Sequence, residues 1–166
     1  MKLHSGWIAG VMLLFVIFSC NLSNNNGNNS NNSNNSNRNS NSISKAPTPN
    51  RPANADVYVN RIYMAKDNNG EPGDETSSYE PGDHTVHCII ELNKAKKGTK
   101  VRYVWMAVDV EGEKDKEIKT TDYTTNSFEN KVHGHLQLPR DWPKGDYRVD
   151  VYINGNLDKT VEYTIE

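Results

Sequence analysis

Three histidines supply the residue type best suited to bind a transition metal in this 166-residue chain. His133 and His135 are two positions apart, so in a β-strand their side chains lie on one face. His87 belongs to a second alternating stretch, and all three imidazoles meet if the two strands are neighbours in one sheet. Imidazole nitrogens bind Zn²⁺ or Cu²⁺ and titrate near neutral pH. The pattern predicts a metal site at His87, His133 and His135 or, alternatively, three solvated side chains on an exposed face.

Cys20 is the second residue with distinctive chemistry, because it ends an apolar run. The apolar residues 7–18 are too few for the roughly 20 that span a bilayer as a helix. A basic start, a short apolar core and a small final residue are typical of a secretory signal. The tetrapeptide Ile17-Phe18-Ser19-Cys20 resembles a bacterial lipobox.

This resemblance implies that residues 1–19 are a lipoprotein signal peptide, cleaved before Cys20. It also implies diacylglycerol on the Cys20 sulfur and usually an acyl chain, such as palmitate, on the new amino terminus. Two or three acyl chains hold a protein on a membrane, whereas one chain binds only marginally. The expected location is the bacterial cell membrane or outer membrane, with the rest of the chain facing the periplasm or the exterior.

Residues 20–55 are expected to be a disordered tether. Residues 21–44 contain 13 Asn and 7 Ser, and such a composition cannot bury enough apolar surface to offset the entropy of ordering. Three prolines then stiffen residues 45–55. A flexible chain of this length has an r.m.s. span of about 30–35 Å, enough to lift a domain clear of the lipid head groups.

Residues 56–166 have the size of one domain. They hold all 21 acidic residues against 15 basic ones, a formal charge of −6. An acidic domain without a basic stripe argues against nucleic acid as a partner. Cys88 is the only thiol there, so the domain has no internal disulfide and its core must suffice alone.

Seven stretches alternate in polarity or are rich in β-branched and aromatic residues, and no helical periodicity occurs. These stretches are residues 57–65, 85–92, 99–110, 116–121, 130–138, 147–153 and 157–165. Short strands at this spacing predict an all-β, seven-stranded Greek-key β-sandwich. Trp105 in the third strand and Tyr147 opening the sixth resemble immunoglobulin-like and fibronectin-III-like domains. Asn154-Gly155 predicts a tight hairpin between the last two strands.

The remaining candidate residues have structural interpretations beside the functional ones. The acidic loop expected over residues 67–83 could bind calcium, but it lacks the ligand spacing of an EF-hand. Trp105 is expected in the core, Cys88 as a small buried hydrophobe, and Trp142 in a turn. No nucleophile elbow, phosphate-binding glycine loop or zinc-protease motif occurs, so we expect a non-catalytic domain without a cofactor.

Three functions remain open from the sequence. The first is a membrane-anchored cell-envelope lipoprotein whose immunoglobulin-like domain binds an envelope or extracellular protein or glycan, through the edge strand at 116–121 or through loops. The second is a metal-binding envelope lipoprotein that uses the three histidines. The third is a structural or assembly factor of an envelope complex.

Overall fold

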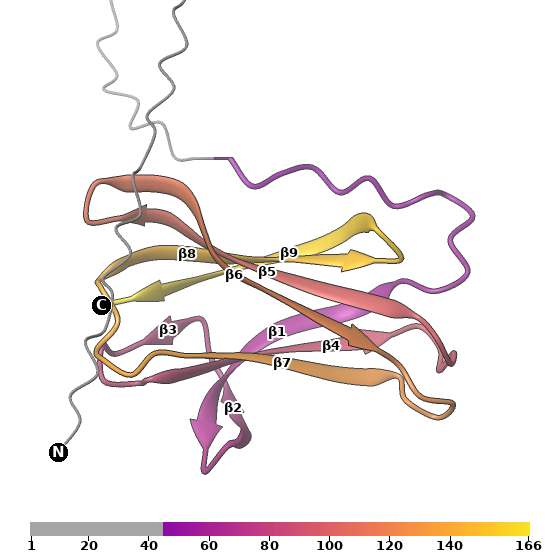
Figure 1. Cartoon of the computed structure of the whole chain (residues 1–166), viewed down its shortest axis with the longest axis horizontal. Helices are drawn as coiled ribbons and strands as arrows, with labels where there is room; N and C mark the ends of the chain where they lie inside the picture. The colour runs from indigo at the N-terminus through magenta and orange to yellow at the C-terminus, as the bar shows by residue number, and fades with distance from the viewer. Residues whose placement is uncertain (1–44) are drawn as a thin grey trace, which may run out of the picture. The chain divides into compact units, whose positions relative to one another are not determined.

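The computed structural model describes residues 45–166, which form nine β-strands in two sheets (Figure 1). The predicted signal peptide, Cys20 and the Asn/Ser-rich tract lie outside the described residues. The strands are β1 (Val59–Asn68), β2 (Glu71–Glu75), β3 (Ser78–Tyr79), β4 (Thr85–Leu92), β5 (Lys100–Val110), β6 (Glu113–Thr124), β7 (Lys131–Gln137), β8 (Gly145–Ile153) and β9 (Asn156–Ile165). One sheet has the order β2-β1-β4-β7, and the other has the order β3-β9-β8-β5-β6.

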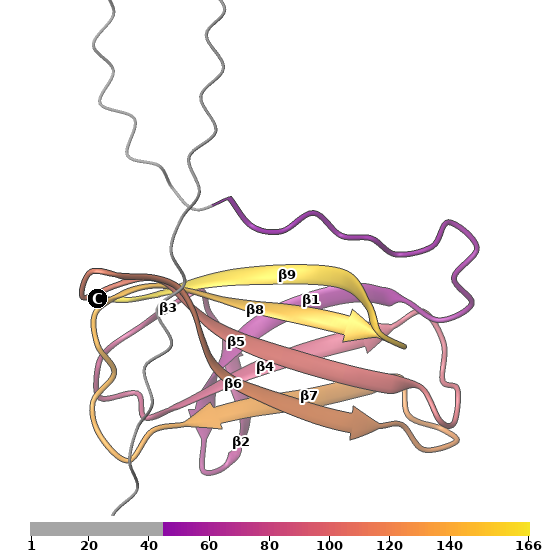
Figure 2. The same ribbon diagram turned by 45° about the horizontal axis from the view of Figure 1, so that its top comes forward.

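The two sheets pack face to face, so the predicted all-β sandwich is confirmed (Figure 2). The chain leaves β4 for the other sheet, runs through β5 and β6, and returns to pair β7 with β4, which is a Greek-key path. The seven expected strands correspond to β1 and β4 to β9. The count of seven was too low, because the segment expected as an acidic loop over residues 67–83 contains β2 and β3.

Alternation along the strands places the core between the sheets, as expected. Trp105, Tyr103 and Tyr163 are fully buried there, and Cys88 is also inaccessible. Along β5 the register shifts between Ala107 and Asp109, which turns Val110 into the core too. Trp142, expected in a turn, is buried as well, and its Nε1 donates to the carbonyl of His84 at 3.2 Å.

Gly134 on β7 lies close against a ring of the opposite sheet. A Cβ atom at this position would lie 3.0 Å from Cγ and Cδ2 of Tyr103, whose ring crosses from β5. The Tyr103 hydroxyl donates to the carbonyl of Val132 at 3.1 Å, so the ring is held over β7. A larger residue at this point of β7 would require the aromatic ring to shift by a few tenths of an ångström.

Two turn features match the sequence expectation. Asn154 and Gly155 have φ values of 50° and 89°, the left-handed pair that a tight hairpin between β8 and β9 requires. The Tyr147 hydroxyl donates to the carbonyl of Pro143 at 2.6 Å, four residues upstream. This contact matches the tyrosine corner of immunoglobulin-like sandwiches.

The chain contacts the sandwich before residue 56, the expected start of the domain. The amide of Asn50 donates to the carbonyl of Leu157 at 2.9 Å, and Arg51 pairs with the buried carboxylate of Asp158 at 3.1 Å. The other Asp158 oxygen accepts the buried amide of Val59 at 2.8 Å. Asp158 therefore joins β9, the start of β1 and the segment that precedes it. No helix in residues 45–166 is long and apolar enough to cross a membrane.

Candidate functional site

The register of β4 and β7 brings the three predicted histidines together. These strands are antiparallel neighbours, with His87 opposite His135 and Ile89 opposite His133. All three imidazoles lie on the outer face of the four-stranded sheet, because Cys88 and Gly134 point toward the core. Their ring centroids are separated by 4.9 Å (His87 and His133), 5.7 Å (His133 and His135) and 5.9 Å (His87 and His135).

The expectation that these side chains are all solvated was wrong for His87. Its side chain is 1% exposed, whereas His133 is half-buried and His135 is exposed. Ala65 lies opposite His87 on β1, and β1 continues into a hairpin with β2 that hangs from this side of the sheet (Figure 1). The outer face is therefore partly covered where the sequence pattern alone indicated solvent.

Asp67 is the fourth member of the cluster, and the sequence analysis did not connect it with the histidines. Its Oδ1 lies 2.8 Å from Nε2 of His87. The same oxygen accepts the amide of Gly70 at 3.1 Å, which fixes the carboxylate at the hairpin turn. We refer to Asp67, His87, His133 and His135 as the histidine cluster.

The hydrogen bonds determine which nitrogen of His87 carries a proton. The hydrogen bond from His87 lowers the pKa of Asp67, and the Gly70 amide lowers it further, so the carboxylate is ionised and only accepts. His87 Nε2 must therefore carry hydrogen, and in the neutral ring the lone pair is on Nδ1. That Nδ1 lies 2.8 Å from Nε2 of His133, and in this neutral tautomer it accepts the hydrogen of that nitrogen.

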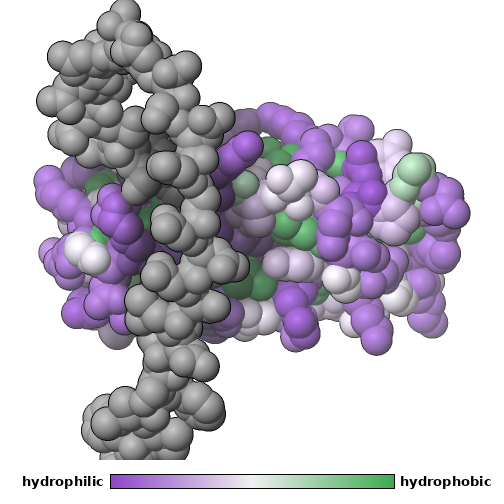
Figure 3. Space-filling view, turned by 90° about the horizontal axis from the view of Figure 1, so that it is seen from above, coloured by the Kyte–Doolittle hydropathy of each residue, from purple (hydrophilic) through white to green (hydrophobic). Residues whose placement is uncertain are grey.

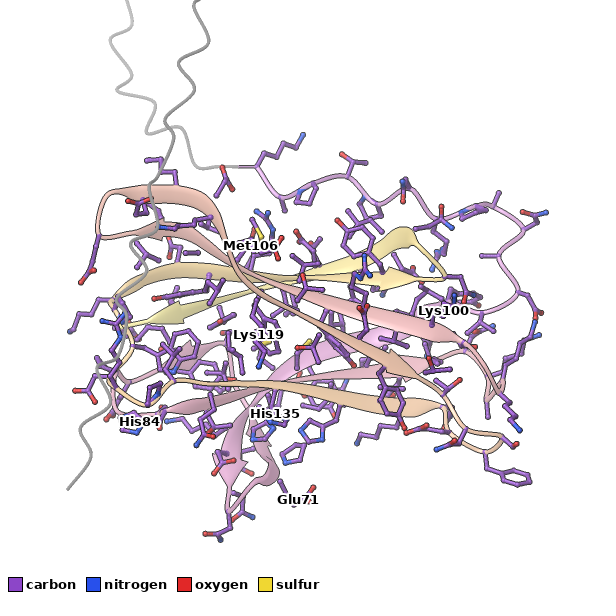
Figure 4. All side chains as sticks on the ribbon, in the orientation of Figure 1. Glu71, His84, Lys100, Met106, Lys119 and His135 are labelled. Atoms are coloured by element: carbon purple, nitrogen blue, oxygen red, sulfur yellow. The ribbon has the colours of Figure 1, made fainter. Side chains whose placement is uncertain are left out.

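The electrostatics of the cluster favour a neutral His133. Burial lowers the pKa of His133, and the charges of His87 and His135 lower it further, while Glu71 acts in the opposite direction. Figure 4 shows His135 on β7 and Glu71 on β2, both on the side of the four-stranded sheet that faces away from the core. Asp67, His87 and His133 form a hydrogen-bonded chain on this face of the sheet.

Within the cluster, His87 is hydrogen-bonded to both Asp67 and His133. Within residues 45–166, no group of three or more His, Cys, Asp or Glu side chains is arranged as it stands to hold a metal ion. Two nitrogens of the cluster are occupied by the His87–His133 hydrogen bond. The predicted metal role of His87, His133 and His135 therefore stays a prediction.

The other candidate residues take structural positions. Trp105 is buried in the core, as expected. Burial raises the pKa of the Cys88 thiol far above its ordinary value, which agrees with its interpretation as a small hydrophobe. In the acidic segment, the carboxylate of Asp67 is committed to His87 and Gly70.

The signal for the unexpected hairpin was present in the sequence. Asn68 pairs with Glu71, and the intervening Asn69 and Gly70 have φ values of 56° and 91°. This is the same Asn-Gly turn chemistry as at Asn154-Gly155. The acidic and Gly/Pro-rich composition around Asn69-Gly70 favoured a loop and obscured it.

Comparison with known proteins adds no assignment of function. No protein-family description matches the sequence, and no curated protein is significantly similar to it. Among solved structures, an immunoglobulin-like protein from Pseudomonas aeruginosa is 13% identical, with a TM-score of 0.49, covering 69% of this chain and 100% of that protein. An alkylpurine DNA glycosylase from Pseudomonas fluorescens, solved bound to DNA with an abasic-site analogue, is 14% identical, with a TM-score of 0.43, covering 68% of this chain and 31% of the glycosylase.

Proposed function

We propose that the protein is a lipid-anchored cell-envelope lipoprotein that displays its immunoglobulin-like domain as a non-catalytic binding module. The observation that carries the anchor is the position of Cys20. It closes the short apolar run and the lipobox-like tetrapeptide, and the Asn/Ser-rich tract follows directly. Two or more acyl chains on this sulfur and its amino group would hold the chain on the membrane.

Two surface features support a binding role for the domain. Strand β6 is an edge of the five-stranded sheet, and its side chains are almost all exposed. In the turn that follows β6, Phe128 is 95% exposed, the most exposed large apolar side chain within residues 45–166. An edge strand can accept an additional strand from a partner, and an exposed aromatic ring beside it is a typical anchor for a protein or glycan.

The face opposite the histidine cluster mixes hydrophilic and hydrophobic residues. Figure 3, seen from above, shows hydrophilic residues around the border of this face and hydrophobic residues visible between them. Strand β6 carries charged side chains of both signs, which is a common way to protect an edge strand from aggregation.

The anchor is tested by replacing each of the two cysteines. Cys20→Ala is expected to abolish incorporation of labelled palmitate and to release the chain from the membrane fraction or leave it unprocessed. Cys88→Ala is the matched control and should remain membrane-bound. Normal processing and membrane association of Cys20→Ala would refute the anchor.

The binding role is tested separately by cross-linking in intact cells. Phe128→Ala should reduce cross-linking to an envelope partner at an unchanged unfolding temperature. The control, Lys144→Ala, alters an exposed residue in the connection between β7 and β8. Equal cross-linking by wild type and both variants would remove the β6–β7 turn as a binding site and would favour an assembly or spacer role.

A further inference from the structure

We infer that the histidine cluster is a binding site for a transition-metal ion of the Zn²⁺ or Cu²⁺ class, with His87, His133 and His135 as ligands and Asp67 as the residue that orients His87. This inference concerns the outer face of the four-stranded sheet and does not depend on the lipid anchor or on a partner at β6.

The spacing of the three rings fits a three-imidazole site. Nitrogens bound at about 2.0–2.1 Å to a tetrahedral Zn²⁺ place imidazole centroids about 5 Å apart. The observed centroid distances are 4.9, 5.7 and 5.9 Å. The His87–His133 separation already agrees with this value, and both longer separations involve His135, whose side chain is exposed.

The His87–His133 hydrogen bond occupies the place that the metal would take. Two nitrogens on one tetrahedral Zn²⁺ are about 3.3 Å apart. His87 Nδ1 and His133 Nε2 are 2.8 Å apart, so a widening of about 0.5 Å converts the hydrogen bond into two metal bonds. When the metal binds, the neutral ring of His133 would carry its proton on Nδ1 instead of Nε2. The lone pair of Nε2 would then be available to the metal.

Asp67 supplies the support that metal-binding histidines commonly have. A ligating imidazole usually donates its other N–H group to a carboxylate, which fixes its tautomer and orientation. His87 donates Nε2–H to Asp67 at 2.8 Å and thereby presents Nδ1 to the cluster. Asp67 is itself fixed by the Gly70 amide.

The surroundings indicate which metals fit. Three neutral imidazoles suit Zn²⁺ and Cu²⁺, whereas Ca²⁺ and Mg²⁺ prefer six or more oxygen ligands. His87 is buried, while His135 is exposed, so a metal can enter from the solvent side. Glu71 on β2 is within electrostatic reach of His133, and the coordination position that three imidazoles leave open on Zn²⁺ would hold water.

The test uses the full chain in detergent without a polyhistidine tag. Titration calorimetry with ZnCl₂ and CuCl₂ should show one ion bound per chain, with CaCl₂ as the negative control. His135→Ala and His133→Ala should each weaken binding at least about 10-fold, and Cu²⁺ electron paramagnetic resonance should show one nitrogen ligand fewer in each. The matched control is His84→Ala, since His84 bonds Asp141 and lies outside the cluster.

The variant Asp67→Asn tests whether Asp67 orients His87 for metal binding or only stabilises the fold. It should weaken Zn²⁺ binding about 10-fold or more while the unfolding temperature without metal changes little. Absence of heat with both metals would overturn the inference. Affinity that is unchanged in both His133→Ala and His135→Ala, or that falls equally in His84→Ala, would overturn it too. Because His135 is exposed, its variant keeps the test decisive if His133→Ala or Asp67→Asn fails to fold.

Discussion

Gly134 lies between His133 and His135 on β7, with its α-carbon against the core, and its replacement by alanine tests how closely the two sheets pack. The added methyl group would lie 3.0–3.1 Å from three ring atoms of Tyr103, where ordinary contacts are 3.4–4 Å. The ring cannot swing aside freely, because it is 1% exposed and its hydroxyl is bonded to the carbonyl of Val132.

The expected cost follows from these contacts. Overpacking of a close-packed core destabilises by about 1–3 kcal/mol. Alanine recovers about 0.4–1 kcal/mol by restricting the unfolded chain. Taking the middle of each range, the net loss in the free energy of unfolding is about 1.3 kcal/mol, which for a domain of this size lowers the unfolding temperature by about 5 °C.

Thermal unfolding followed by near-ultraviolet circular dichroism measures this change. Gly82→Ala is the matched control, because a Cβ atom there meets nothing within 4 Å. It should unfold at the wild-type temperature or slightly above. Adding Tyr103→Leu to Gly134→Ala should cost less than the sum of the two single changes, since the clash disappears with the ring. Equal unfolding temperatures for Gly134→Ala and Gly82→Ala would refute this account of the packing.

Three further predictions concern two buried or half-buried carboxylates and the local stability of an edge strand. Asp158→Ala should lower the free energy of unfolding by about 1–3 kcal/mol in urea titrations, because the buried amide of Val59 loses its acceptor. Arg51→Ala should cost less than about 1 kcal/mol, since the Arg51 side chain is 40% exposed. Equal effects of the two changes would contradict the structural role given to Asp158. Burial raises the pKa of Asp83, but the hydrogen bonds from the Glu80 amide and Lys66 outweigh it and lower the pKa below its ordinary value of 3.8. The ionised carboxylate therefore stabilises the fold above pH 3.8. This stabilisation disappears as the pH falls through the lowered pKa. Asp83→Asn should therefore flatten the acid limb of the stability profile measured by urea titration, and an unchanged slope would refute it. In hydrogen exchange, the amides of β2 should exchange faster than those of β4, because β2 is an edge strand whose side chains are all at least partly exposed; slower exchange in β2 would count against this view.

Most of the sandwich could be predicted because alternation is a direct consequence of strand geometry. Cys88 and Trp105 fall on apolar faces by simple counting, and Asn154-Gly155 specifies its own turn. The strand pairing expected from the immunoglobulin-like resemblance was correct for β4 and β7, which brings His87 beside His133 and His135.

The burial of His87 and the role of Asp67 could not be predicted in the same way. Alternation assigns a side chain to a face, but it does not say whether another segment covers that face. Asp67 is 20 residues from His87 in the sequence, and only the bend of β1 into its hairpin brings the two together. Asp67 lies in a segment with several acidic residues, and nothing in the local sequence distinguishes it as the one that bonds His87.

The β1–β2 hairpin owes its position mainly to polar contacts, which links it to the histidine cluster. Strand β2 has the sequence Glu-Pro-Gly-Asp-Glu and contributes no large apolar side chain. Hydrophobic burial therefore cannot hold β2 in place. The described contacts of the hairpin include the ion pair between Arg61 on β1 and Glu75 on β2, and the hydrogen bond between Asp67 on β1 and His87 on β4. Any ligand that requires Asp67 to hold His87 also stabilises the hairpin turn at Gly70, because the same carboxylate oxygen accepts both hydrogen bonds. The acidic segment is then a structural part of the site rather than a solvated loop beside it.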